Sequence, residues 1–168
     1  MEAAEAKLSE GSQGAQELAG KYLTFSLGKE DYGVGILKVR EIIGVMEITA
    51  VPHTPRYIKG VINLRGRVIP VLDLRLKFGM EPQEYDERTC IIVVEMQGQN
   101  SAVQVGMVVD SVSEVLNVTA EEIEPPPALG SSSETDNILG MAKIKGEVKI
   151  LLDVDRVVGE GVLKQFEE

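Results

Sequence analysis

The side chains best suited to catalysis are few in this chain, and they are scattered. It has one histidine, His53, and one cysteine, Cys90. A Ser-His-Asp or Cys-His set would have to use His53, which lies in the proline-flanked segment 52–55 with no sequence neighbour to orient its ring. Cys90 begins the apolar run 91–94, which is typical of a small buried thiol. A single cysteine forms no internal disulfide, and one cysteine with one histidine excludes a Cys/His zinc site.

Three aspartates could instead act as paired carboxylates or metal ligands, namely Asp73, Asp110 and Asp153. However, Asp73 and Asp153 occupy equivalent positions in an internal repeat described below, each just before a predicted helix. An aspartate there can accept backbone N–H bonds as an N-cap. The segment Gly33-Val34-Gly35 lacks the third glycine of a nucleotide fingerprint, and no P-loop is present. The sequence therefore predicts a protein that is not an enzyme and that uses no cofactor or metal.

Charge limits the partners. The chain carries 17 basic and 27 acidic residues, a net charge of −10. A phosphate-binding surface needs an excess of Lys and Arg, so nucleic acid and an anionic membrane surface are both disfavoured. No apolar run approaches the ~20 residues of a membrane span. We expect a soluble, cytoplasmic protein that does not insert directly into the membrane.

The pattern of apolar residues favours β structure. Apolar residues make up 43% of the chain but aromatic residues only 4%, so the core must be aliphatic, and the abundant Val and Ile suit strands. Residues 1–18 carry few large apolar side chains and are predicted to form a mobile tail, leaving 19–168 as the folded domain. Strands are expected at 22–27, 32–36, 90–95, 103–109 and 150–154. Their spacing is typical of an all-β barrel or sandwich.

An internal repeat is the most informative feature. Residues 60–74 align without gaps with 140–154, so that Gly60 matches Gly140. Upstream, 33–42 matches 106–115, and the difference in offset falls at a longer Pro- and Ser-rich loop around 125–133. Two ordered blocks in register predict two related, intertwined lobes, one centred on 30–85 and one on 90–155.

Each repeat predicts a hairpin followed by a helix. Arg65-Gly66 and Lys145-Gly146 lie between alternating strands, where glycine can supply a positive φ. The first helix is expected at 74–78 and the second from Val154 toward the C-terminus. Thr119–Glu122 matches a capping box.

The two repeats differ at their exposed turns. Asn63 and Arg65 stand in the first where the second has lysines, at 143 and 145. An arginine fork at a hairpin tip can bind a carboxylate with two hydrogen bonds, although a solvated turn arginine is equally consistent with the pattern. Val39 and Glu41 share one face if their segment is a strand. The alternative places Val39 in the core and Glu41 in solvent.

The blocks 32–42, 54–66 and 70–75 resemble the CheW-like family of bacterial chemotaxis coupling proteins, with Asn63-Leu64-Arg65-Gly66 as the most specific stretch. Segments 108–116 and 139–140 extend the resemblance, which covers roughly residues 20–160. It implies two SH3-like five-stranded β-barrels, with short helical turns and a C-terminal helix. It also implies a non-catalytic adaptor that couples the cytoplasmic tip of chemoreceptors to the regulatory domain of the histidine kinase CheA, at receptor arrays beneath the inner membrane. Whether such adaptors also assemble into rings is left open.

The resemblance also implies contact residues. Receptor contact falls on the groove between the lobes, at Ile36, Leu37, Val39, Glu41, Gly60, Asn63 and Arg65. Kinase contact falls at Thr49, Val115 and Leu129. Some relatives carry an aromatic residue where Leu129 stands, which leaves a ring-forming contact at that point undecided.

Two other functions compete with this one. The chain could be a related CheW-like regulatory module in another receptor–kinase pathway, or part of a kinase or coupling–receiver fusion; its length favours a free-standing protein. An enzyme or nucleic-acid binder built on similar barrels is opposed by the missing catalytic sets and by the net charge.

Overall fold

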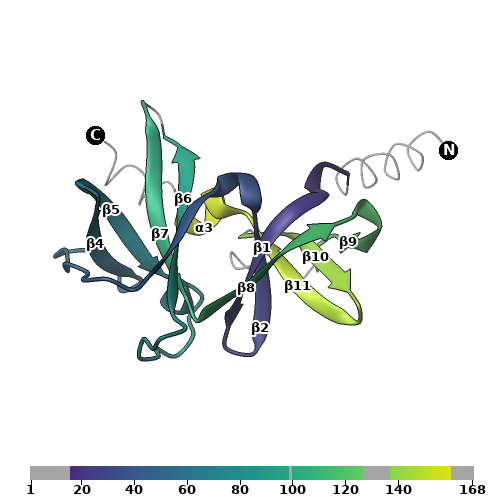
Figure 1. Ribbon diagram of the computed structural model, residues 1–168, viewed down its shortest axis with the longest axis horizontal. Coiled ribbons are helices and arrows are strands. Elements are labelled where there is room, and N and C mark those ends of the chain that lie inside the picture. Colours follow the sequence, from purple (N-terminus) through teal and green to yellow (C-terminus); the bar gives the residue numbers. More distant parts are fainter. Residues whose placement is uncertain (1–15, 99, 127–136, 160–168) are drawn as a thin grey trace.

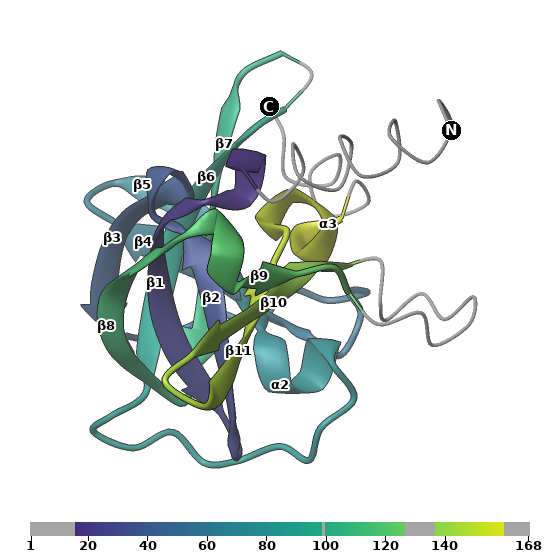
Figure 2. The same ribbon diagram turned by 90° about the vertical axis from the view of Figure 1, so that its right-hand side faces the viewer.

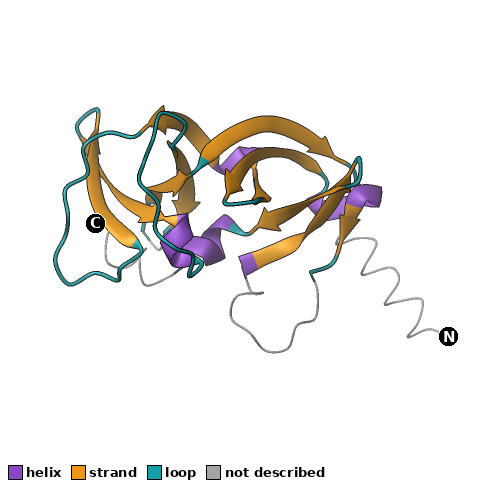
Figure 3. Ribbon diagram, turned by 90° about the horizontal axis from the view of Figure 1, so that it is seen from below, coloured by secondary structure: helices purple, strands orange, loops and turns teal. Residues whose placement is uncertain are grey.

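The computed structural model describes residues 16–98, 100–126 and 137–159, and strands dominate them (Figure 3). One sheet has the order β8 (Ser111–Val118), β1 (Gly20–Leu27), β2 (Glu30–Gly35), β11 (Glu147–Leu152), β10 (Ile138–Ile144), β9 (Ile123–Glu124). The other has the order β3 (Val39–Gly44), β6 (Cys90–Gln97), β7 (Ala102–Val109), β5 (Arg67–Asp73), β4 (Ile58–Leu64). The helical elements are η1 (Ile36–Lys38), α2 (Leu74–Lys77), η2 (Ala120–Glu122) and α3 (Val154–Val158).

The two sheets form two lobes that lie side by side (Figure 1). We call the six-stranded one, on the right of Figure 1, the first lobe and the five-stranded one, on the left, the second lobe. The predicted all-β, two-lobed fold is confirmed. The sixth strand of the first lobe is β9, only two residues long; its place in the second lobe is taken by an isolated bridge between Thr49 and Val61.

The lobes exchange hairpins between the two sequence repeats. In the second lobe, β5 runs parallel to β7 with Val71 opposite Gly106. In the first lobe, β11 runs parallel to β2 with Leu151 opposite Gly33, which is the same pairing between equivalent residues. Each lobe therefore takes a hairpin and edge strand from one repeat and a second hairpin from the other. Both predicted centres, 30–85 and 90–155, are thereby divided, because β2 lies in the first lobe and β6 and β7 lie in the second, as intertwined lobes require.

Three apolar clusters form the interior of the described part of the chain. One lies inside the first lobe around Tyr22 and Leu151, and one inside the second around Ile62 and Ile91. The third and largest joins the lobes, packing Phe25 and Leu27 from β1 with neighbours that include residues of β6 and α3. Because β6 alternates between this cluster and its own lobe's interior, both of its faces are buried. The lobes thus share a core and form one packed unit.

The predicted caps are present at both short helices. The Asp73 carboxylate accepts from the backbone N–H groups of Arg75 at 2.9 Å and Leu76 at 3.4 Å, and Asp153 accepts from Arg156 N at 3.4 Å. Helix α2 matches its predicted span to within a residue. Helix α3 is shorter than the predicted run to the C-terminus, because it ends at Val158 and Gly159 adopts φ 84°.

Two further expectations concern the edges of the first lobe. Thr119–Glu122 forms the predicted capping box, with Thr119 N donating to Glu122 Oε1 at 2.9 Å. Most of the predicted tail, residues 1–15, lies outside the described residues. Leu18 packs against the first-lobe cluster, and its carbonyl accepts from the Tyr22 hydroxyl at 2.6 Å.

Candidate functional site

The structure joins two of the expected receptor-contact residues directly. Glu41, on β3, forms an ion pair and hydrogen bond with the guanidinium of Arg65, at the tip of the β4–β5 hairpin. Arg65 has φ 53° and Gly66 φ 88°, so two successive residues take left-handed conformations to make the tight turn. Asn63 Oδ1 accepts from Gly66 N at 2.9 Å and braces the same turn. The sequence left Arg65 as either a carboxylate-binding fork or a solvated residue; within this chain its partner is Glu41.

The apolar members of the expected receptor site lie where the chain passes from one lobe to the other. Leu37, in the single turn η1, is 92% exposed. Ile36 and Val39 are half-buried and pack against the shared core. Val39 pairs with Val94 of β6 at the start of β3, and β3 leads directly to Glu41. The expected residues therefore form a chain of neighbours along η1 and β3, ending at the hairpin tip.

Gly60 and Thr49 lie together, although the resemblance assigned them to different partners. Thr49 N and Val61 O are 2.8 Å apart, and so are Val61 N and Thr49 O. This bridge brings the Thr49 carbonyl against Gly60, which is buried and has φ 143°. A Cβ on residue 60 would lie 2.0 Å from that oxygen. Gly60 thus has a structural requirement of its own, whatever it contacts.

The expected kinase-contact residues do not gather in one place. Val115 lies on β8 of the first lobe and is 49% exposed, whereas Thr49 is in the second lobe. Leu129 lies outside the described residues. Of this group, Val115 is the one large apolar side chain that the described part of the structure leaves at the surface.

Several exposed apolar residues were missed by the sequence reasoning. Val68, on β5, is 69% exposed and lies directly opposite Asn63 across the β4–β5 hairpin. Its place beside the turn in an alternating strand could have indicated an outward side chain. Ile42 and Val45 are also exposed. Most of the large exposed apolar side chains in the described residues therefore belong to η1 or the second lobe, close to Glu41 and Arg65 in sequence or in strand pairing.

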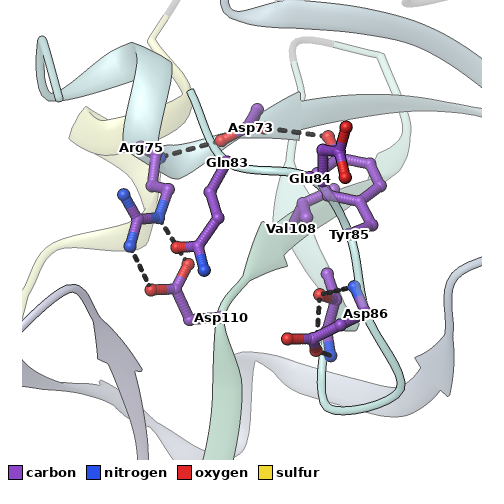
Figure 4. Close-up of a pocket in the computed structure, with 9 residues that line it drawn as sticks. Asp73, Arg75, Gln83, Glu84, Tyr85, Asp86, Val108 and Asp110 are labelled. Carbon is purple, nitrogen blue, oxygen red and sulfur yellow. Dashed lines mark hydrogen bonds and ion pairs between the residues drawn. The ribbon is translucent and has the colours of Figure 1, made fainter. Parts of the chain in front are cut away.

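A polar pocket lies away from these residues, beside α2, and its lining includes Asp73, Tyr85 and Asp110 (Figure 4). The Tyr85 hydroxyl donates to Asp73 Oδ2 at 2.8 Å, and burial together with this carboxylate raises the pKa of Tyr85. The cavity measures about 20 Å³, which is room for a water molecule rather than for a metabolite. In the described ranges, no group of three His, Cys, Asp or Glu side chains could hold a metal ion, and no helix is long and apolar enough to cross a membrane.

A partly buried ion pair in the first lobe predicts a dependence of stability on pH. Lys149 Nζ donates to Asp31 Oδ2 at 2.7 Å, and this hydrogen bond is the main cause that lowers the pKa of Asp31. A lowered folded-state pKa contributes stability above the unfolded value near 3.9, which is lost as the pH falls through the folded pKa. Asp31→Asn is therefore expected to lower the free energy of unfolding at pH 7 and to flatten its decline below about pH 4. Urea titrations at stepped pH measure this. In a Lys149→Met background the same substitution should have little effect, and an undiminished effect there would contradict the assignment.

Comparisons with known proteins agree with this architecture. The family model described as CheW-like domain matches residues 21–161. The chain is 43% identical over 138 residues to the chemotaxis protein CheW of Klebsiella aerogenes, covering 82% of this chain and 81% of that protein. It is 32% identical over 139 residues to the chemotaxis protein CheW of Bacillus subtilis, covering 82% and 86%. The crystal structure of the scaffolding protein TtCheW from Thermoanaerobacter tengcongensis superposes with a TM-score of 0.76 at 35% identity, covering 86% of this chain and 96% of that one.

Proposed function

The chain belongs to the CheW-like family, and from that premise we propose that it is a non-catalytic adaptor that couples chemoreceptors to the histidine kinase CheA. It acts at receptor arrays beneath the inner membrane, in the cytoplasm, by surface contact alone. The observation that supports this most directly is the Glu41–Arg65 pair, set among exposed apolar side chains of the second lobe. A partly exposed ion pair next to exposed aliphatic groups suits recognition of another protein's surface.

The receptor contact is proposed to be a helix laid against this surface. Leu37 and the half-buried Val39 supply apolar contact for the stripe of a receptor helix, as in other helix-in-groove complexes. Glu41 and Arg65 give register and specificity more than affinity, because a partly exposed ion pair is screened by water. The proposed receptor-contact residues are Ile36, Leu37, Val39, Glu41, Gly60, Asn63 and Arg65.

The kinase contact is proposed to involve Val115 on β8, together with Thr49 and Leu129. Val115 and the Glu41–Arg65 pair lie in different lobes, so the Val115 part of the kinase contact is separate from the receptor contact. Coupling then requires no chemical step. It is a difference in contact free energy between two arrangements of receptor and kinase.

Reversal of the charge at the hairpin tip tests the receptor contact. We expect Arg65→Glu to weaken binding of a receptor-tip fragment by on the order of 2 kcal/mol, roughly 30-fold, because it removes the fork and places two carboxylates together. The matched control is Lys145→Glu, which makes the same change at the equivalent turn of the first lobe with the same φ of 53°. Isothermal titration calorimetry measures both. Equal losses in the two variants, or no loss in a folded Arg65→Glu variant, would remove Arg65 from the site.

The adaptor role itself is tested by assembling the complex. Size-exclusion chromatography of the protein with a chemoreceptor-tip fragment and the CheA regulatory domain should give a ternary complex, whereas the two partners alone should elute apart. Binding of neither partner would contradict the proposal. Capture of a receptor and a kinase of a different pathway would place the chain as a CheW-like regulatory module there. Ring assembly would appear as larger species in the mixture with the regulatory domain.

A further inference from the structure

Besides the core that the two lobes share, two short helices in equivalent positions of the repeat join them. Helix α2 follows β5 of the second lobe, and α3 follows β11 of the first. The ring of Phe78, at the end of α2, stacks on Tyr32 of the first lobe, with centroids 5.8 Å apart. Helix α3, seen between the lobes in Figure 1, contacts β6 of the second lobe. Figure 2 shows both helices in the turned view. Each helix therefore reaches from its own lobe to the other.

The contact beside α2 is polar and strongly directional. Arg75 Nε and Nη2 each donate to the Asp110 carboxylate at 2.6 Å (Figure 4). The same carboxylate accepts from Gly28 N, in the β1–β2 turn of the first lobe, at 2.7 Å. Asp110 N also donates to Ser26 O of β1 at 3.1 Å. Asp110 itself lies between β7 of the second lobe and β8 of the first, so one side chain binds groups of both lobes.

Neighbouring contacts reinforce this polar joint. Arg75 Nη1 donates to Glu81 O at 3.1 Å, which ties in the loop after α2. The side chain of Met80 from that loop lies against Gly28. The pKa of Asp110, which burial alone would raise, is lowered overall by the hydrogen bonds from Arg75 and Gly28 N. The carboxylate is therefore held in its charged form by donors from both lobes.

The equivalent joint at α3 is built differently. Its ion pair, Lys38 with Asp155, is a single contact of 3.4 Å between side chains 46% and 51% exposed. The Arg75 and Asp110 side chains are only 15% and 24% exposed. The rest of the α3 joint is apolar packing of Val154, Val157 and Val158 in the shared core. Apolar contact has no preferred direction, whereas a forked guanidinium–carboxylate pair fixes both distance and orientation.

We propose that the Arg75–Asp110 pair is the positioning contact that fixes the angle between the two lobes. Helix α3 supplies apolar contact that has no preferred direction. The pair thereby fixes how the proposed receptor residues of the second lobe are placed relative to Val115 on β8, which begins one residue after Asp110. As a device for transmitting receptor binding to the kinase contact, the proposal rests on the proposed function. As a statement about the angle between the lobes, it stands without it.

The angle is tested by a distance measurement on the protein alone. The separation of the lobes is measured by pulsed electron paramagnetic resonance between two spin labels. The labels are attached at Gln97→Cys in the second lobe and Asn117→Cys in the first, in a Cys90→Ser background. We expect Asp110→Asn to broaden or shift the distance distribution, because the neutral amide loses the forked pair, while the matched control Asp155→Asn leaves it unchanged. Arg75→Lys keeps the positive charge but not the forked guanidinium and should behave like Asp110→Asn. If one of the two variants does not fold, the other still tests the proposal. The proposal would be overturned if folded Asp110→Asn and Arg75→Lys variants gave the same distance distribution as the parent.

Transmission is tested with the two binding fragments. In folded Asp110→Asn, affinity for the receptor-tip fragment alone and for the kinase regulatory domain alone should stay within about twofold of the parent. In the parent, binding of one fragment is expected to change the protein's affinity for the other by about 5-fold or more. In the variant this factor should fall toward one. A variant that lost stability only would keep that factor. An unchanged factor overturns the role of the Arg75–Asp110 pair in transmission. If the parent binds neither fragment, the proposed function is contradicted, and the distance measurement alone decides whether the pair fixes the angle between the lobes.

Discussion

Phe25→Ala is expected to lower the free energy of unfolding of the whole protein by about 3–5 kcal/mol. Phe25 is fully buried in the core shared by the lobes, and its ring stacks on Tyr32 at a centroid distance of 5.8 Å. Tyr32 in turn stacks on Phe78 of the second lobe. Truncation therefore opens a cavity where both lobes meet, rather than inside one of them. Because the chain has no tryptophan, urea unfolding is best followed by circular dichroism.

The same variant, studied by hydrogen exchange, distinguishes one folding unit from two. Hydrogen exchange should show that Phe25→Ala speeds opening of the most protected amides of β1, in the first lobe, and of β6, in the second, by similar factors. Val115→Ala, at an exposed position, is the control and should change stability by no more than about 0.5 kcal/mol. Loss of protection in β1 alone, with β6 unaffected, would contradict a shared core.

Gly60→Ala is expected to cost about 3 kcal/mol or more, because two penalties combine. The backbone φ of 143° is one that side-chain-bearing residues rarely adopt, and the new Cβ would meet the Thr49 carbonyl at 2.0 Å. That oxygen belongs to the backbone and is held by the bridge to Val61, so it cannot rotate away. Thermal and urea unfolding measure the loss.

Two other glycines provide graded controls for this prediction. At the equivalent position of the other repeat, a Cβ on Gly140 would lie 2.9 Å from Glu124 O, and at Gly44 it would meet nothing within 4 Å. The destabilisation should therefore decrease from Gly60→Ala to Gly140→Ala to Gly44→Ala. A Gly60→Ala variant as stable as the parent would contradict this structural requirement, and loss of receptor binding by that stable variant would leave receptor contact as the only role of Gly60.

The local features of the fold could be predicted from the sequence because they depend on near neighbours. The aligned repeats located both hairpins, both turns with Gly66 and Gly146, and the caps Asp73 and Asp153. The division of strands between the lobes could not be predicted. Gly33 and Gly106 are equivalent in the repeat, so the sequence alignment allows β5 to pair with the hairpin of either copy in the same register. The alignment therefore does not tell which copy it takes.

The candidate site shows the same limit. Glu41 and Arg65 were identified as separate candidates, but their pairing depends on the distance between β3 and the β4–β5 tip, which a sequence does not contain. Asp110 was considered with the metal-ligand and paired carboxylates, whereas it binds Arg75 and the Gly28 turn. Both partners are far from it along the chain, and no local pattern marks such a contact.

Coupling of receptor to kinase is measured as control of kinase activity in a reconstituted system. Autophosphorylation of CheA would be followed with receptor-tip assemblies present, with and without this protein, at increasing ratios of adaptor to kinase. We predict that receptor control of the kinase appears only with the adaptor and saturates once the adaptor matches the kinase in amount. This control should be lost with Arg65→Glu but kept with Lys145→Glu. Full control at trace amounts of adaptor, as a catalyst would give, or no effect of the adaptor at any ratio, would contradict the adaptor role.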